Sequence, residues 1–138
     1  MEALSRGAAL AVCVDSAREA IRCVNANIES LGFSDRARVR VGDVFHVIKD
    51  LDKQGSRFNI IFADPPYTAT VNTADGAVSI ARHIVEAIDA SHLLEEGGRL
   101  FLENPKGLVI PDDRLKNLHQ NGCRQYGKSA LYEYTQKR

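Results

Sequence analysis

The chain is poor in cysteine and lacks both a long apolar run and an excess of charge of either sign. Its three cysteines, Cys13, Cys23 and Cys123, form no CxxC pair and are odd in number. This argues against a disulfide framework or a thiolate zinc site, so they are expected to pack as small apolar side chains. No window approaches the roughly 18 apolar residues of a membrane helix, and residues 1–7 do not resemble a signal peptide. The sequence therefore indicates a cytoplasmic protein without a membrane segment.

The charge is balanced overall but unevenly placed. Eighteen Lys and Arg against eighteen Asp and Glu exclude a uniformly basic coat that would bind nucleic acid over the whole surface. Residues 1–103 carry 11 basic and 15 acidic side chains, whereas residues 104–138 carry 7 basic and 3 acidic ones. The basic end could meet a polyanion, although solvated side chains on a small hairpin are the alternative. The four histidines share no metal-ligand spacing, so no metal is expected.

Short apolar runs alternate with segments of three- and four-residue periodicity, which predicts one α/β domain over residues 1–138 with a mostly parallel sheet. The expected strands are residues 9–14, 37–41, 58–63 and 99–103, the third being a buried central strand. A helix should begin with a capping box formed by Ser16 and Glu19 and end at Gly32. A second, shorter helix should follow Asp43.

The second half contains a polar stretch, Thr68 to Gly76, which is long enough to be a mobile loop or lid. A helix through residues 80–88 follows it. A short helix is expected at residues 112–120 and an antiparallel hairpin at residues 122–126 and 129–135, around Gly127-Lys128.

Three acids follow three of the expected strands: Asp15, Asp43 and Asp64. In open α/β sheets, ligands bind beyond the carboxyl ends of the strands. Asp15 suits the two hydroxyls of a ribose, and Asp43 suits the exocyclic amine of an adenine, with Val44 packed on the ring. Each of these two acids could instead simply cap a helix.

The segment Asp64-Pro65-Pro66-Tyr67 is more specific. Two prolines remove two backbone donors and hold the chain extended, so the Asp64 carboxylate and the Pro65 carbonyl form a group of acceptors without a nearby donor. Such acceptors could take the two hydrogens of a nucleobase amine and direct its lone pair at an electrophilic methyl group. Tyr67 would stack on the extruded base. The alternative is a simple turn after a strand.

At these residues the sequence resembles the RsmD-type ribosomal RNA methyltransferases, which use S-adenosylmethionine. Matching segments run through the chain in the family's order: Glu2 to Ala8, Asp15, Gly42-Asp43-Val44, Phe62 to Tyr67, Leu94 to Gly98 and Tyr126 to Leu131. The resemblance implies a Rossmann-like methyltransferase fold that methylates the exocyclic amine of a guanine in small-subunit ribosomal RNA. Asp64, Pro65 and Tyr67 would be catalytic, Asp15, Asp43 and Val44 would bind cofactor, and Pro66, Tyr67 and Lys128 would contact substrate.

The family's first strand and glycine-rich loop have no counterpart before Glu2, so we expect an N-terminally truncated domain with unpaired edges on the strands that end at Asp15 and Asp64. Cofactor affinity should then be poor. Two alternatives stay open. One is another amino-methyltransferase, such as one that acts on DNA adenine, and the other is an inactive remnant that only binds nucleic acid or a partner.

Overall fold

The computed structural model describes residues 1–74 and 76–137, which form two compact units, Met1–Val47 and Ile48–Arg138. Strands and helices alternate along both, as the sequence predicts. None of the helices in these described ranges has the length and apolar character needed to cross a bilayer. Each unit is described by itself.

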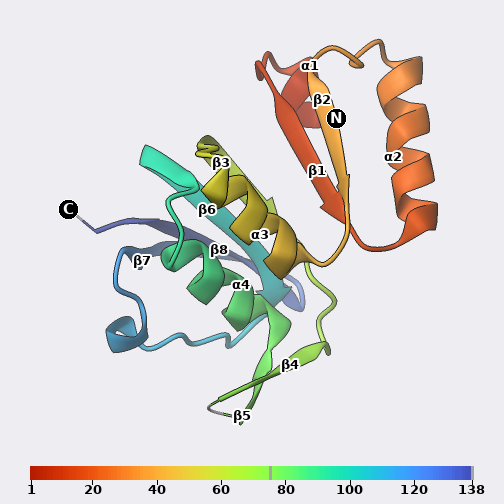
Figure 1. Ribbon diagram of the computed structural model, residues 1–138. Coiled ribbons are helices and arrows are strands. Elements are labelled where there is room, and N and C mark those ends of the chain that lie inside the picture. Colours follow the sequence, from red (N-terminus) through yellow and green to blue (C-terminus); the bar gives the residue numbers. More distant parts are fainter. Residues whose placement is uncertain (75, 138) are drawn as a thin grey trace. The chain divides into compact units, whose positions relative to one another are not determined.

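The first unit is a two-stranded parallel sheet with a helix on one face (Figure 1). It contains α1 (Glu2–Ser5), β1 (Ala11–Asp15), α2 (Arg18–Ser30) and β2 (Ala37–Val41). The register pairs Ala11 with Ala37 and Asp15 with Val41, so the two strands end side by side. The core is formed by apolar side chains of α1, α2 and β2, namely Leu4, Ile28 and Ala37.

The C-terminal end of α2 agrees with the prediction, whereas its N-terminal end does not. Gly32 has φ +69° just beyond the helix, which is the left-handed residue expected there. The capping box of Ser16 and Glu19 is wrong, because the N-cap residue is Ala17 and no side chain caps the helix. Asp15 Oδ1 instead accepts from the backbone N–H of Ala17 at 2.8 Å. The Asp15 side chain thus forms a local turn ahead of the helix, whose first residue is Arg18.

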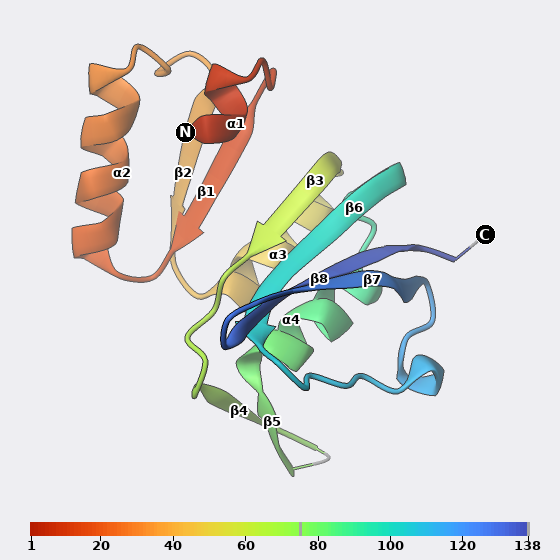
Figure 2. The ribbon, with the colours of Figure 1, turned by 180° about the vertical axis from the view of Figure 1, so that it is seen from behind.

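The second unit is a four-stranded mixed sheet in the order β3-β6-β8-β7. Its elements are most of α3 (Val44–Lys53), β3 (Phe58–Ala63), β4 (Thr70–Thr73), β5 (Gly76–Ser79), α4 (Ile80–Asp89), β6 (Leu94–Pro105), η1 (Asp112–Arg114), β7 (Leu118–Tyr126) and β8 (Ser129–Gln136). β3 and β6 are parallel, whereas β6, β8 and β7 are antiparallel. The helices lie on one face of this sheet (Figure 2). The predicted C-terminal hairpin is confirmed, and Gly127 turns it with φ +56°.

Among the described strands, β1 pairs with β2 alone and β3 pairs with β6 alone. Each therefore has a strand partner on one side only, as expected from the sequence. The predicted burial of β3 is wrong, because Ile60 is 65% and Phe62 is 61% exposed. These two residues alternate along β3 and so share a face. The helices of the second unit cover the other face, which explains the exposure of both side chains.

Three boundaries in the second unit also differ from prediction. Thr68 to Gly76 is not simply a loop: β4 and β5 form an antiparallel hairpin in which Thr70 pairs with Ser79, favoured by β-branched Thr and Val. Asp75, part of the predicted loop, lies outside the described residues. The helix expected at residues 112–120 is confined to η1, because Leu118 already starts β7. The predicted strand at residues 99–103 extends over 94–105.

The cysteines do not pack as the composition suggests. Cys23 on α2 and Cys123 on β7 are exposed, and Cys13 on β1 is half-buried. Cys23 lies outside the buried positions of α2, which are Ile21 and Ile28. Cys123 is opposite Tyr132 in the hairpin ladder, on the edge strand of the sheet. Only Cys13 therefore comes near the expected environment.

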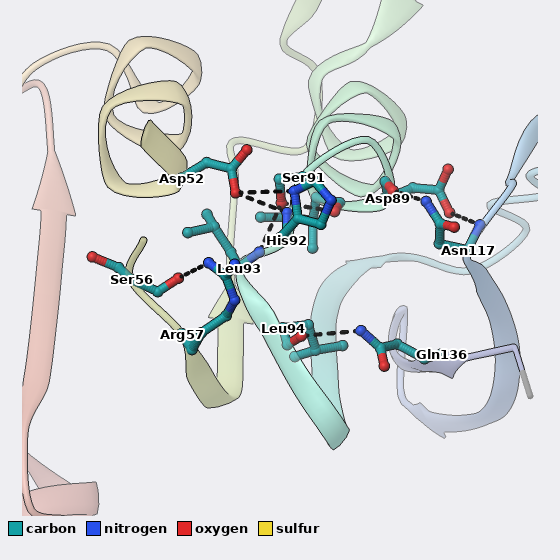
Figure 3. Close-up of polar contacts among 11 residues, drawn as sticks. Asp52, Ser56, Arg57, Asp89, Ser91, His92, Leu93, Leu94, Asn117 and Gln136 are labelled. Atoms are coloured by element: carbon teal, nitrogen blue, oxygen red, sulfur yellow. Dashed lines mark hydrogen bonds and ion pairs between the residues drawn. The ribbon is translucent and has the colours of Figure 1, made fainter. Parts of the chain in front are cut away.

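Several polar contacts lie at the end of the sheet where β3 and β6 begin, and some of them join the helices to the sheet (Figure 3). Asp52 Oδ1 on α3 accepts from the backbone N–H of His92 at 2.9 Å. Gln136 on β8 donates to the carbonyl of Leu94 at 3.0 Å. Asp89, at the end of α4, has a side chain only 5% exposed and meets Asn117 ahead of β7. These contacts lie at the opposite end of the strands from Asp64.

Candidate functional site

Two acids lie at the adjacent carboxyl ends of β1 and β2. Asp15 ends β1, and Asp43 follows the turn at Gly42, whose N–H donates to the Asp15 carbonyl at 3.0 Å. Both side chains are exposed. The structure of the first unit thus brings together the two carboxylates that the sequence assigns to one ligand.

Both acids also accept local backbone N–H groups, and Asp43 caps a helix by doing so. Asp43 Oδ1 accepts from the backbone N–H groups of Phe45 at 3.0 Å and His46 at 3.1 Å, so it caps α3. Asp15 makes the equivalent contact with Ala17. Each uses Oδ1, and among the described residues no hydrogen bond is found to Oδ2 of either. Capping and ligand binding are therefore compatible for these carboxylates.

The two carboxylate acceptors suit the adenosine part of S-adenosylmethionine. Carboxylates accept from ribose hydroxyls and from an exocyclic amine, and Asp15 and Asp43 present them at one end of a parallel strand pair. Val44 starts α3 and is half-buried, leaving part of an apolar side chain beside Asp43. The residues present fit such a group.

The second unit carries the segment Asp64-Pro65-Pro66-Tyr67, which we call the proline corner. It follows directly on β3, which ends at Ala63. Pro65 is buried, whereas Asp64, Pro66 and Tyr67 are exposed. The Pro66 carbonyl accepts from the backbone N–H of Ala69 at 3.1 Å. The buried Pro65 ring thus fixes a corner whose acid points outward.

The acceptors of the proline corner are not used by their neighbours. Within the described residues, neither the Asp64 carboxylate nor the Pro65 carbonyl receives a hydrogen bond, and Asp64 has no ion pair. A carboxylate and a carbonyl left without protein donors can accept the two hydrogens of an amine. This is the arrangement that the sequence predicts for the second unit.

The hydroxyl of Tyr67 contacts two residues that sequence reasoning missed. It lies 3.1 Å from Glu103 Oε1 on β6 and 3.0 Å from Ser129 Oγ on β8. The Tyr67 side chain remains 45% exposed. A signal for Glu103 was present in the sequence, since it stands near the end of a predicted strand, as Asp64 does. Ser129 gave no such signal.

Lys128 lies beside this cluster. It occupies the turn between β7 and β8, directly before Ser129, and its carbonyl accepts from the backbone N–H of Lys106 at 3.3 Å. Both lysines are exposed, as is Tyr126, which is 60% exposed and faces Ser129 across the hairpin. The predicted substrate residues Pro66, Tyr67 and Lys128 are therefore gathered at one edge of the second unit.

The structure does not offer a metal centre in the residues it describes. No group of three or more histidine, cysteine, aspartate or glutamate side chains comes close enough to hold an ion there.

Comparisons with known proteins show which family the chain resembles. The family described as "Conserved hypothetical protein 95" matches residues 1–135. A protein of Bacillus subtilis named "putative rRNA methyltransferase YlbH" is 30% identical over 137 residues, covering 99% of this chain and 69% of its own length. "Ribosomal RNA large subunit methyltransferase K/L" of Pseudomonas syringae is 30% identical over 116 residues, which make up 83% of this chain but only 15% of that protein.

The fold has counterparts among solved structures. A solved structure described as "SMU.776, a putative methyltransferase complexed with SAH" has a TM-score of 0.70 to this chain at 14% identity, covering 96% of this chain and 40% of the other. At that identity the likeness concerns the fold alone. The α/β architecture with its mixed sheet is therefore the Rossmann-like fold of S-adenosylmethionine-dependent methyltransferases, as the sequence predicts.

Proposed function

Because the match over residues 1–135 makes the chain a member of the conserved hypothetical protein 95 family, we propose that it methylates ribosomal RNA at the exocyclic amine of a guanine in the small subunit. The observation that carries the proposal is the proline corner, with its exposed Asp64 carboxylate and Pro65 carbonyl free of protein donors. The names of the two relatives support ribosomal RNA as the substrate class.

The cofactor in this proposal is S-adenosylmethionine, held at its adenosine end by Asp15, Asp43 and Val44. When bound, it supplies an electrophilic methyl group. The structure with SAH supports this choice through the shared fold. The first unit's residues do the binding, and their exposed carboxylates need no rearrangement of the capping contacts to accept hydroxyl and amine donors.

The proline corner orients the substrate. Asp64 and the Pro65 carbonyl each accept one hydrogen of the guanine amine, which withdraws the nitrogen lone pair from the ring and directs it toward the methyl group. Formation of the nitrogen–carbon bond would break the carbon–sulfur bond, with the electron pair staying on sulfur, and the methylated nitrogen would release one proton to solvent. Tyr67 stacks on the extruded base and Pro66 lines its entry. Lys128 meets the RNA backbone as a point charge and reads no sequence. The residue that turns a bound base into a nucleophile is thus Asp64.

Two substitutions at Asp64 test this mechanism. Asp64→Ala should lower kcat by about 10²–10³, the range known for loss of one preorganised hydrogen-bonding group, while leaving adenosine binding unchanged. Asp64→Asn should keep part of the activity, because the amide oxygen still accepts. The measurement is transfer of labelled methyl to RNA, with cofactor binding followed by calorimetry. Equal loss of transfer and of cofactor binding in Asp64→Ala would show that Asp64 is structural.

The substrate is identified by offering small-subunit RNA, large-subunit RNA and DNA in parallel. We expect labelled methyl in small-subunit RNA, recovered as N2-methylguanosine after digestion. Large-subunit RNA is the second candidate, favoured by the match to the Pseudomonas protein. Methylated adenine in DNA would identify a different amino-methyltransferase. Absence of any heat with millimolar S-adenosylmethionine would identify a remnant that only binds nucleic acid or a partner.

A further inference from the structure

Three segments far apart in the sequence meet at the hydroxyl of Tyr67. Tyr67 belongs to the proline corner, Glu103 to β6 and Ser129 to β8, and the two contacts are 3.1 Å and 3.0 Å long. In the antiparallel register, Glu103 is opposite Leu131, and Ser129 lies two residues before Leu131. Glu103 and Ser129 therefore share one face of the sheet as diagonal neighbours. Their polar atoms converge on one point above that face.

The direction of the two hydrogen bonds follows from the groups involved. An ionised carboxylate only accepts, so the phenol must donate its single proton to Glu103 Oε1. The phenol oxygen is then left as an acceptor for Ser129, whose hydroxyl donates to it. Serine, tyrosine and glutamate form a chain with one defined polarity. Removing either partner leaves the phenol held at one contact instead of two.

The Tyr67 ring would otherwise be loosely held. The side chain is 45% exposed, so packing restrains only part of it. Holding the hydroxyl at two points fixes the ring about both side-chain torsions before any substrate arrives. A freely moving ring would lose conformational entropy when it binds the base. A ring that the folded protein already holds loses less of this entropy on binding.

We propose that Glu103 and Ser129 are positioning residues that hold the Tyr67 ring in the plane in which the target base stacks. They act through the phenol and do not contact the reacting nitrogen. This inference rests on the proposed function for its effect on RNA binding, whereas the restraint on the ring is a property of the chain alone. The two parts are measured separately.

The first measurement is a steady-state comparison of variants. Ser129→Ala and Glu103→Ala should each raise KM for RNA about 2- to 12-fold, the range that corresponds to immobilising one side chain, with kcat within about twofold of the original. Tyr67→Phe loses both contacts at once and should raise KM at least as much. Glu103→Gln should recover most of the loss, because its amide oxygen still accepts from the phenol. Thr135→Val is the matched control, since Thr135 shares the face and strand of Ser129 but contacts His119.

A double variant tests whether the partners act through the phenol. Tyr67→Phe with Ser129→Ala should have the KM of Tyr67→Phe alone, because the serine has no hydroxyl left to hold. If the two effects add, Ser129 acts on the substrate by itself and the proposal is overturned. A merely structural role would lower Tm as KM rises, so thermal unfolding of each variant is recorded as well.

The second measurement needs no substrate. NMR relaxation of the ¹³C-labelled Tyr67 ring should show an ordered ring in the original chain and faster motion in Ser129→Ala and Glu103→Ala, with no change in Thr135→Val. Unchanged ring order in both variants would overturn the proposal. A ring that loosens as expected, in a chain that transfers no methyl to any RNA, would leave the restraint established and remove the proposed function instead.

Discussion

The buried carboxylate of Asp89 gives the sharpest prediction for stability. It lies at the end of α4, 5% exposed, and accepts three backbone N–H groups from the segment that leads into β7: Lys116 at 2.9 Å, Asn117 at 2.8 Å and Leu118 at 2.7 Å. Asn117 returns a fourth contact by donating to the Asp89 carbonyl at 2.7 Å. One side chain therefore anchors the start of an edge strand to a helix (Figure 3).

The magnitude follows from what each substitution leaves unpaired. In Asp89→Ala the buried Leu118 N–H loses its acceptor outright, whereas water can partly replace the acceptor of the two less buried donors. With an unpaired buried group costing about 1–3 kcal/mol, we expect a loss of roughly 2–4 kcal/mol. Asp89→Asn keeps Oδ1 for Asn117 and Leu118 but sets an amide N–H₂ against Lys116, so it should cost only about 1–2 kcal/mol.

Urea unfolding followed by tyrosine fluorescence is the suitable assay. All four tyrosines lie in the second unit and the chain has no tryptophan, so the signal reports that unit alone. The midpoint should fall with an unchanged m value. Asp113→Ala, an exposed acid on η1, is the control and should stay within about 0.5 kcal/mol. Equal losses in Asp89→Asn and Asp89→Ala would refute the reasoning, because they would show that the retained oxygen is not what matters.

Two further predictions concern the sheet of the second unit. Gly98→Ala should destabilise it by about 1–3 kcal/mol in the same urea assay, because a Cβ there would lie 2.8 Å from the Glu95 carbonyl and 3.1 Å from that of Asn59, two backbone atoms that cannot move aside cheaply. Burial raises the pKa of Tyr134 above its ordinary value of 10.0. The unfolded chain therefore loses this proton first, and stability is complete below pH 10 and falls above it, by up to about 1.4 kcal/mol per pH unit. Tyr134→Phe should flatten that decline, and an equally steep decline in this variant would contradict the cause given.

Much of the fold could be predicted from periodicity. The strand at residues 37–41 and the apolar strand at 58–63 have the predicted bounds, since β-branched and apolar runs bounded by Gly or Asp leave few alternatives. The four-residue spacing of Ile80, Ile84 and Ile88 likewise predicts α4. Local patterns suffice where one face of an element is buried.

The predictions fail where contacts between residues that are distant in the sequence determine the local structure. Nothing near Asn117 in the sequence shows that Asp89, 28 residues away, holds this segment extended rather than helical. The exposure of Ile60 and Phe62 depends on which face of the sheet the helices cover, and apolar composition cannot reveal that. The capping box of α2 failed because the N-cap residue is Ala17, one residue later than a cap at Ser16 requires.

The candidate site likewise combines features that local sequence reveals with features that only long-range contacts create. The positions of Asp15, Asp43, Asp64 and Tyr67 just after strands follow from the sequence, because acids and an aromatic directly follow recognisable apolar runs, whereas their roles stay predictions. The relevance of Ser129 was not visible in the sequence, because it depends on the pairing of β3 with β6 and of β6 with β8, which brings residues 62 positions apart within hydrogen-bonding distance. Contacts between strands that are distant in sequence are those that composition and spacing leave undetermined.

The shared contact at the Tyr67 hydroxyl has a consequence for the order in which the chain is completed. During synthesis, Tyr67 leaves the ribosome long before Ser129, and Ser129 reaches its place only when β8 pairs with β6. A nascent chain that has already paired β3 with β6 thus has Glu103 in place but still lacks Ser129, one of the two contacts that hold the aromatic ring. The corner between residues 64 and 67 becomes fully assembled only as the final hairpin closes.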